Sequence, residues 1–152
     1  MSKAIIVYTS VHHQNTLKLV QAVAACIQAD TVDLLKDAHP DLAEYDCVFL
    51  ASGIYFNTLH RSLMDFIEHT AFKGKKVCIL YTCGFRYREY AKPAARLLAQ
   101  KGAHYAGSFG CRGFDTYGLL KKIGGISKGH PNQTDLEKAT AFAAGVVSNR
   151  RP

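Results

Sequence analysis

The chain has 152 residues, of which 48% are hydrophobic and 20% are charged, as in an ordinary soluble globular protein. This length favours a single domain over residues 1–152, large enough to bury a real core. No apolar run is long enough to cross a bilayer, and the chain opens directly into a strand pattern rather than a signal peptide. A cytoplasmic location is therefore expected.

The net charge of +7 is unevenly distributed along the chain. Residues 1–70 carry four Lys and Arg against eight Asp and Glu, whereas residues 71–152 carry fifteen against four. The second half therefore favours acidic partners, anionic ligands or an anionic membrane surface, the alternative being a solvated face with no partner. No nucleic-acid partner is expected.

The five cysteines show no C-x-x-C spacing, and their odd number argues against a disulfide framework. Cys26, Cys47 and Cys78 lie within apolar helix or strand patterns, which indicates inert core thiols. Cys83 and Cys111 come at the carboxyl ends of predicted strands, where a cleft would expose them, although passive packing is the favoured alternative. The histidines have no metal-ligand spacing, so no metal site is expected.

The first predicted element is a buried strand at residues 4–7, whose continuous, mostly β-branched apolar residues suit a parallel sheet. A hydroxyl-rich turn over residues 8–16 leads into a helix at residues 17–27. A helix start leaves four backbone amides unpaired and carries positive potential, so this turn is suited to hold a phosphate. Four side chains would surround the anion, namely Thr9, Ser10, Asn15 and Thr16. Alternatively, Asn15 or Thr16 merely caps the helix.

Strands and helices alternate through the rest of the chain. The patterns predict strands at 31–35, 47–53, 76–82 and 105–109, and helices at 60–70, 90–101 and 136–147. Thr134 or Asp135 would cap the last helix, and residues 37–46 form a connection. This alternation predicts an α/β fold of three layers, with a five-stranded parallel sheet in the order 2-1-3-4-5.

Ligands on such sheets bind at the carboxyl ends of the strands, beside the point where the strand order reverses. Three loops would meet there, at residues 9–16, 52–60 and 82–90. The second and third loops combine aromatic residues with a glycine, which suits a planar phosphorylated ligand. Flavin mononucleotide (FMN) fits this composition better than a dinucleotide does. The alternative is a pair of loops whose aromatic residues merely cover the loop edges.

Three parts of the sequence resemble the flavodoxin family. They are S-V-H-H-Q-N-T at 10–16, A-S-G-I-Y-F at 51–56 with L-H-R-S-L at 59–63, and G-F-D-T at 113–116 to G-H-P-N at 129–132 with D-L-E-K-A at 135–139. The first is similar to the Ser-x-His-His-Gly-Asn-Thr form of the flavodoxin phosphate loop. The resemblance covers essentially the whole chain.

This resemblance implies non-covalent FMN, with its phosphate on residues 10–16 and its isoalloxazine ring between the loops at 52–57 and 82–90. The backbone from Gly53 to Phe56 would accept a hydrogen bond from the reduced ring, and Tyr55 and Phe56 would shield it. His12 and His13 would either donate to the phosphate or face solvent. The implied cofactor-binding residues are Thr9, Ser10, His12, His13, Gln14, Asn15 and Thr16; Ser52, Gly53, Ile54, Tyr55, Phe56 and Asn57; and Thr82, Cys83, Gly84, Phe85, Tyr87 and Tyr90.

The chain departs from the family pattern at two points. Gln14 stands where these relatives have glycine, so a positive φ there would leave the loop strained or reshaped, at a cost on the order of 1 kcal/mol or more. The basic second half also departs, because flavodoxins that act as general electron carriers are usually acidic.

Residues 110–133 are too long for a plain connection, which favours a functional loop. The loop interleaves basic and apolar side chains, namely Arg112, Lys121, Lys122 and Lys128 with Leu119, Leu120, Ile123 and Ile126. Such a mixture suits a segment that meets an anionic membrane surface or a quinone, or that covers the flavin edge. The alternative is a short helix packed on the sheet. This basic loop and the one after the third strand are also similar to those of menaquinone-dependent protoporphyrinogen oxidases.

Three functional hypotheses follow. The favoured one is an FMN-binding electron carrier that passes electrons singly to or from a redox protein. The positive charge of the second half of the chain would favour an acidic partner. The second is an FMN-dependent oxidoreductase that acts on a quinone or a porphyrinogen. The third is a non-redox binding module with a decayed flavin site, motivated by Gln14.

Overall fold

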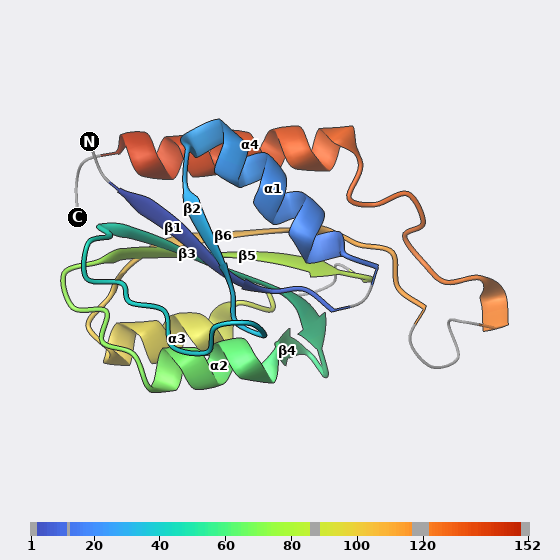
Figure 1. The fold of residues 1–152 in the computed structure, drawn as a ribbon. Helices are drawn as coiled ribbons and strands as arrows, with labels where there is room; N and C mark the ends of the chain where they lie inside the picture. The colour runs from blue at the N-terminus through green and yellow to red at the C-terminus, as the bar shows by residue number, and fades with distance from the viewer. Residues whose placement is uncertain (1–2, 12, 86–88, 117–121, 150–152) are drawn as a thin grey trace.

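The structure is a computed structural model, and it describes residues 3–11, 13–85, 89–116 and 122–149. Three layers are formed, with α1 and α4 on one face of a central sheet and α2 and α3 on the other (Figure 1). In chain order the elements are β1 (Ala4–Thr9), α1 (Asn15–Ile27), β2 (Asp30–Asp33), β3 (Cys47–Tyr55), β4 (Thr58–Leu59), α2 (Arg61–Glu68), β5 (Lys76–Cys83), α3 (Lys92–Gln100), β6 (His104–Arg112) and α4 (Gln133–Ser148).

The sheet has the strand order β2-β1-β3-β5-β6, and all neighbouring pairs along this path are parallel. This confirms the predicted α/β fold and its 2-1-3-4-5 order. The additional strand β4 pairs antiparallel with the end of β3 through Ile54↔Leu59 and Tyr55↔Thr58. A strand of two residues is too short to show an alternation pattern, so β4 was not predicted.

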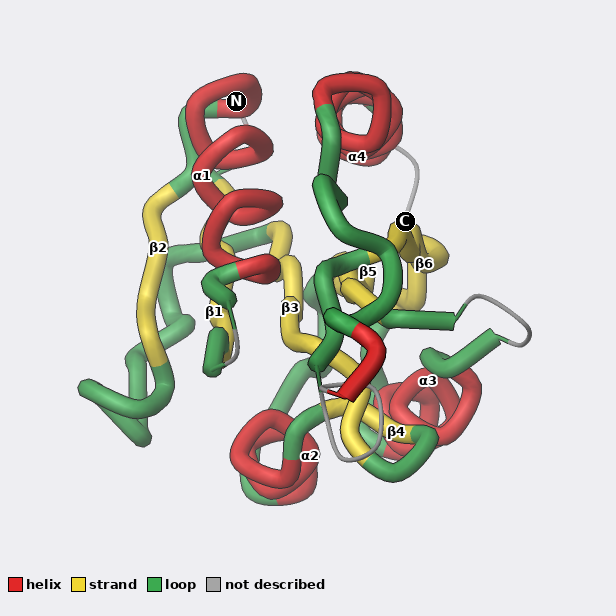
Figure 2. Tube along the Cα trace, turned by 90° about the vertical axis from the view of Figure 1, so that its right-hand side faces the viewer, coloured by secondary structure: helices red, strands yellow, loops and turns green. Residues whose placement is uncertain are grey.

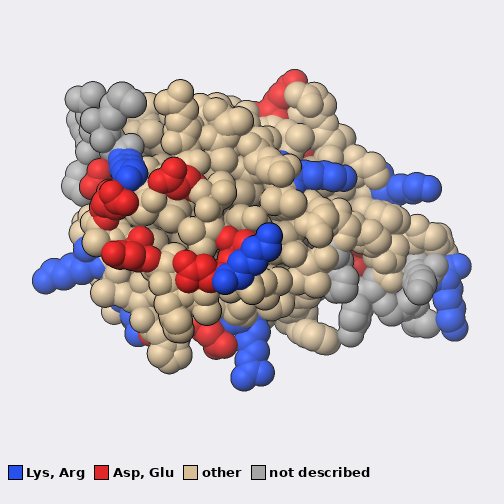
Figure 3. Space-filling view, in the orientation of Figure 1, with Lys and Arg blue, Asp and Glu red and all other residues tan. Residues whose placement is uncertain are grey.

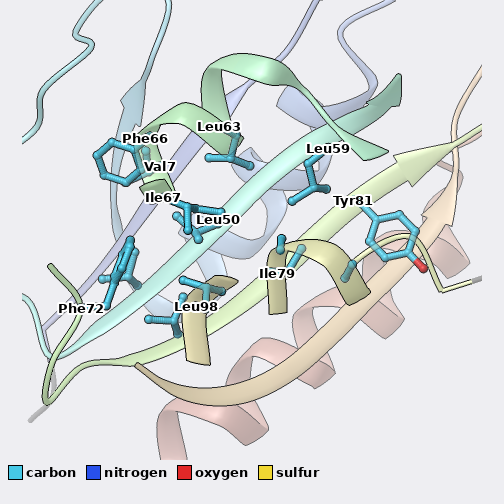
Figure 4. Close-up of a cluster of buried hydrophobic side chains, with 14 of the residues drawn as sticks. Val7, Leu50, Leu59, Leu63, Phe66, Ile67, Phe72, Ile79, Tyr81 and Leu98 are labelled. Atoms are coloured by element: carbon cyan, nitrogen blue, oxygen red, sulfur yellow. The ribbon is translucent and has the colours of Figure 1, made fainter. Parts of the chain in front are cut away.

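The core lies on both faces of the sheet, because alternate residues of each central strand point to opposite sides. On β1, Ile5 and Val7 join the apolar cluster under α2 and α3, whereas Ile6 joins the cluster under α1 and α4. Figure 4 shows the first cluster, with Val7 and Leu50 among its labelled members. Burial on both faces explains why the strand sequences are continuously apolar.

Helix α4 begins earlier than the sequence predicts. Its N-cap is Asn132, whose Oδ1 accepts from the Asp135 amide at 2.9 Å, while Asp135 Oδ2 accepts from the Asn132 amide at 2.8 Å. The predicted cap at Thr134 or Asp135 is therefore wrong, because Asp135 is the third helical residue of a capping box. Strand β6 likewise continues past Phe109 to Arg112.

The cysteines are free thiols, and four of them are buried. Burial raises the pKa of Cys47 to about 11 and that of Cys78 well above its usual range, which agrees with inert core thiols. Cys26 is exposed, so its predicted core position is wrong. Cys83 and Cys111 are packed rather than exposed, and the Cys83 thiol donates to the Cys111 carbonyl at 3.6 Å.

Acidic side chains gather on the face shown in Figure 3, where the segment between β2 and β3 runs in front of the sheet. Basic side chains lie among the acidic ones and also project from the periphery in the same view. Among the described residues, no helix combines the length and the apolar character that a membrane span requires.

Candidate functional site

A cleft of about 320 Å³ opens at the carboxyl ends of β1, β3 and β5, the edge that faces the viewer in Figure 2. This volume lies in the usual range of small-molecule pockets. Three predicted loops meet there and contribute Asn15, Thr16, Gly53, Ile54, Tyr55, Phe56, Asn57, Thr82, Cys83, Gly84, Phe85 and Tyr90. The lining also includes Val11, Gly113, Phe114 and Asp115, which the list of expected site residues omits.

Helix α1 starts at the cleft, and its N-cap residue Gln14 makes no side-chain cap hydrogen bond. Asn15 and Thr16 are its first residues, so neither is the N-cap, and the alternative of a merely capping role is wrong. Ser10 Oγ accepts from the Leu17 amide at 3.1 Å and thereby ties the turn to the first helical turn. The helix start therefore presents backbone donors and positive potential at the cleft, as anion binding requires.

Gln14 keeps the left-handed backbone that the family pattern assigns to glycine, with φ 54° and ψ 28°. His13 before it also has φ 54°. The turn is thus strained rather than reshaped, because side-chain-bearing residues rarely adopt positive φ. The Gln14 side chain is exposed and is absent from the cleft lining, so the glutamine does not obstruct the site.

Asn15 lines the cleft and has one polar atom bonded to the fold and one without a partner. Its Nδ2 donates to the Phe114 carbonyl at 2.8 Å, which fixes the orientation of the amide because a carbonyl accepts only from the nitrogen side. Oδ1 is then left buried without a hydrogen-bond partner among the described residues, in a residue that is only 8% exposed. An unpaired buried acceptor costs about 1–3 kcal/mol, so this atom favours a ligand that donates an O–H or N–H.

The inner end of the cleft is closed by two threonines. Thr16 and Thr82 are both buried, and their hydroxyl oxygens lie 3.2 Å apart, in hydrogen-bond contact. The contact joins the first turn of α1 to the end of β5, so the two sides of the cleft are held at a fixed separation.

Aromatic residues form the outer walls. Tyr55 ends β3 and packs edge-on against the His60 ring at 5.0 Å, and Phe56 follows it at positive φ with its side chain 85% exposed. On the other side Tyr90 is buried and donates from its hydroxyl to the carbonyl of Phe85 at 3.1 Å, while the Phe85 side chain is 56% exposed. This arrangement suits a flat ring whose edge reaches solvent.

Two expected site residues have hydroxyls that serve the fold instead. Thr9 Oγ1 lies 2.6 Å from Ser62 Oγ, and Ser52 Oγ donates to the Gly53 carbonyl at 2.7 Å and accepts from the His60 amide at 3.1 Å. These bonds hold the start of α2 against β1 and β3, and neither Thr9 nor Ser52 lines the cleft.

Of the predicted site residues His12, His13 and Tyr87, the structure describes only His13. His13 is exposed, and its Nε2 lies 2.9 Å from the Thr116 hydroxyl while its ring packs 4.4 Å from that of Phe114. His12 and Tyr87 lie outside the described residues. His13 therefore contacts the segment after β6 rather than the cleft itself.

The segment after β6 forms the fourth wall. The Gly113 amide donates to the Cys83 carbonyl at 2.9 Å, and Asp115 and Ile126 exchange two backbone hydrogen bonds of 3.0 and 2.8 Å. Packing here is tight, because a Cβ on Gly84 would lie 2.6 Å from Asp115 Oδ2. The G-F-D-T string, the length of the loop and its mixture of basic and apolar residues were the sequence signals for this wall, and a segment that covers the flavin edge was one of the expectations. No pattern indicated which residues of the segment line the cleft.

The remainder of the 110–133 stretch is only partly described. Leu119, Leu120 and Lys121 lie outside the described residues. Of the two isoleucines in this stretch, Ile123 is 72% exposed, whereas Ile126 is half-buried and packs beside Gly84.

Comparisons with known proteins agree with this fold. A family model for the flavodoxin domain matches residues 5–123. An uncharacterised protein of Methanocaldococcus jannaschii is 38% identical over 150 residues, which cover 97% of this chain and 99% of the relative.

Solved structures with the same fold include proteins of quite different length. Oxidised flavodoxin 1 of Bacillus cereus has a TM-score of 0.73 and 17% identity over 98% of this chain and 100% of its own. Rubredoxin oxygen oxidoreductase of Desulfovibrio gigas has a TM-score of 0.74 and 14% identity, with 96% of this chain matching 35% of the larger protein.

General stress protein 14 of Treponema denticola, solved in complex with FMN, has a TM-score of 0.65 and 14% identity, covering 95% of this chain and 99% of its own. These identities are low, so the structural likenesses establish the fold alone. The family model covers most of the sequence, and the chain belongs to the flavodoxin family.

Proposed function

We propose that the protein binds FMN non-covalently in this cleft and acts as an electron carrier that exchanges single electrons with a protein partner. FMN supplies the redox chemistry when it is bound, and the protein holds it and adjusts its electronic surroundings. The observation that carries the proposal is the buried Asn15 Oδ1, which has no partner among the described residues.

The residues around Asn15 fit the polar tail of FMN. The hydroxyls of a ribityl chain are donors, as Oδ1 requires, and the amides at the start of α1 suit its terminal phosphate. The left-handed backbone at Gln14 preserves the turn that presents these amides. The complex of Treponema denticola general stress protein 14 with FMN supports the assignment, since the two proteins share a fold.

The aromatic walls fit the ring of FMN. Tyr55 on one side and Tyr90 on the other would flank a flat heterocycle, and Tyr90 is fixed by its hydrogen bond to the Phe85 carbonyl. Burial between such walls excludes water and changes the relative stability of the oxidised and reduced ring.

An exposed rim favours a carrier over an enzyme for a small substrate. Phe56 and Phe85 stand at the mouth with most of their surfaces in solvent, which allows a second protein to approach closely. Among the described residues that line the cleft, Asp115 is the only Asp, Glu, Lys, Arg or His. The described lining therefore offers few acidic or basic side chains for proton transfer to or from a quinone or porphyrinogen.

The absorbance spectrum of the purified protein tests this proposal first. We expect a flavin spectrum as isolated, or quenching of FMN fluorescence when FMN-free protein is titrated at micromolar concentration. Protein that neither is yellow nor binds added FMN would refute the proposal. Steady-state turnover with NAD(P)H and a quinone would instead favour the oxidoreductase, whereas reduction by a flavodoxin reductase without such turnover supports the carrier.

A further inference from the structure

The rim of the cleft carries cations that the fold itself does not use. Lys18 stands in the first turn of α1, Lys92 begins α3, Arg112 ends β6, and Lys122 and Lys128 belong to the segment after β6 whose first residues line the cleft. All five side chains belong to exposed residues. Within the described residues, none of them has a carboxylate within ion-pair distance.

Two lysines at the opposite edge of the sheet, Lys75 and Lys76, are engaged by the fold. Lys75 Nζ donates to the carbonyls of Leu42 and Tyr45, at 2.8 Å each. Lys76 Nζ donates to the Val146 carbonyl at 3.0 Å. The sequence places positive charge at both edges, but these contacts leave the cleft edge with charge that is available to another molecule.

Apolar side chains are exposed at the same edge. Phe56, Phe85 and Val11 line the mouth of the cleft, and the largely exposed Ile123 lies next to Lys122. Four of the six large apolar side chains that are exposed in the described residues belong to this edge. Apolar groups surrounded by charge are typical of interaction surfaces.

We propose that this basic rim, defined by Lys18, Lys92, Arg112, Lys122 and Lys128, docks the acidic face of a redox protein. The inference rests on the proposed carrier function and names the chemistry of its partner. Opposite charge steers the two proteins together and fixes their orientation, while the apolar mouth permits close contact at the site of electron exchange.

A protein fits this surface better than a lipid bilayer does. An interfacial membrane segment presents its apolar residues along one face of one helix. Here the exposed apolar residues come from separate segments, with Val11 before α1, Phe56 after β3 and Phe85 after β5. They surround a concave opening, which suits the convex face of a protein.

The test measures binding of an acidic plant-type [2Fe–2S] ferredoxin, with FMN-free and FMN-loaded protein, at about 10 mM and about 300 mM salt. The rim variant is Lys92→Glu with Lys128→Glu. The control variant is Lys73→Glu with Lys138→Glu, which changes the net charge by the same amount. Lys73 lies in the turn before β5 and Lys138 lies on α4, and both residues are exposed. Thermal unfolding of each variant verifies the fold.

At low salt we expect the rim variant to weaken ferredoxin binding roughly tenfold or more and the control less than about twofold, with the difference lost at high salt. Equal weakening in both variants would overturn the inference, because net charge alone would then explain it. Absence of ferredoxin binding would also overturn it, as would rim-dependent binding of phosphatidylserine vesicles in its place. FMN-free protein that binds ferredoxin through the rim but never takes up FMN would refute the carrier function and leave the docking surface standing.

Discussion

Asn15 and Phe114 are joined by a hydrogen bond of 2.8 Å from the amide Nδ2 to the backbone carbonyl, across ninety-nine positions of sequence. The bond connects the first turn of α1 to the segment after β6. It also orients Asn15 so that Oδ1 remains available in the wall of the cleft. One side chain therefore shapes the site and supplies an acceptor to it.

Replacing Asn15→Ala removes both roles. The Phe114 carbonyl loses its donor, so we expect the free energy of unfolding of the FMN-free protein to fall by about 1–2 kcal/mol. Loss of the acceptor should raise the dissociation constant for FMN about tenfold, as measured by fluorescence quenching. Gln21→Ala, at an exposed position of the same helix, is the control and should change neither quantity. Unchanged FMN affinity in Asn15→Ala would contradict the assigned role.

Gln14 and Gln28 test whether strain at the phosphate turn matters to the cofactor. Both have φ 54°, but Gln28 ends α1 far from the cleft. Gln14→Gly should leave FMN affinity within about threefold of the wild type, because the backbone shape is already present. Gln14→Val should destabilise the protein by about 1–2 kcal/mol, since a β-branched residue tolerates positive φ poorly. Gln28→Val should cost similar stability without weakening FMN binding; an equal loss of FMN affinity there would show that the effect is not local.

Gly84→Ala should displace the fourth wall of the cleft. The added methyl group would lie 2.6 Å from Asp115 Oδ2 and 2.8 Å from Ile126 Cδ1, so the segment must move. We expect a loss of about 1–3 kcal/mol in stability by chemical denaturation, together with weaker FMN binding. Gly145→Ala in α4 meets no atom within 4 Å and should stabilise the protein by about 0.5–1 kcal/mol. Full FMN affinity in Gly84→Ala would mean that this wall is dispensable.

Alkaline pH should destabilise the protein through its buried thiols. The pKa of Cys47 rises from 9.0 to about 11 on burial, so the folded state retains a proton that the unfolded state has lost. The contribution of Cys47 to the free energy of unfolding is therefore fully present below pH 9.0 and is lost as the pH rises toward about 11. The pKa of Cys78 is raised by the same cause, and its effect has the same sign. Denaturation curves across this range should become less pH-dependent in Cys47→Ala, and an identical slope would contradict the attribution.

Thiol labelling separates the exposed cysteine from the buried ones. Native protein treated with iodoacetamide near neutral pH should be alkylated at Cys26 alone, because Cys47 and Cys78 are inaccessible and protonated. Cys26→Ser should abolish this labelling, and peptide mass analysis identifies the site. Rapid modification of Cys83, which borders the cleft, would show that a reagent reaches this thiol through the cleft.

Local patterns in the sequence determined the fold and the position of the cleft. The continuous apolar strands alternate with helical repeats, and this alternation leaves few ways to build a parallel sheet. The hydroxyl-rich turn before α1 and the aromatic loops after β3 and β5 therefore had to meet at one edge. Family-specific strings at 10–16 and 51–56 added the expectation of FMN.

Contacts between distant residues decided the details of the site. Thr9 and Ser52 are loop hydroxyls in sequence, but the positions of Ser62 and His60 direct them into the fold. The wall formed by Gly113 to Asp115 depends on bonds to Asn15 and Cys83, which no local pattern encodes. The roles of the lysines were also decided by the tertiary structure. The total charge follows from composition alone, but the availability of each charge depends on which carbonyl or carboxylate the folded chain places beside it.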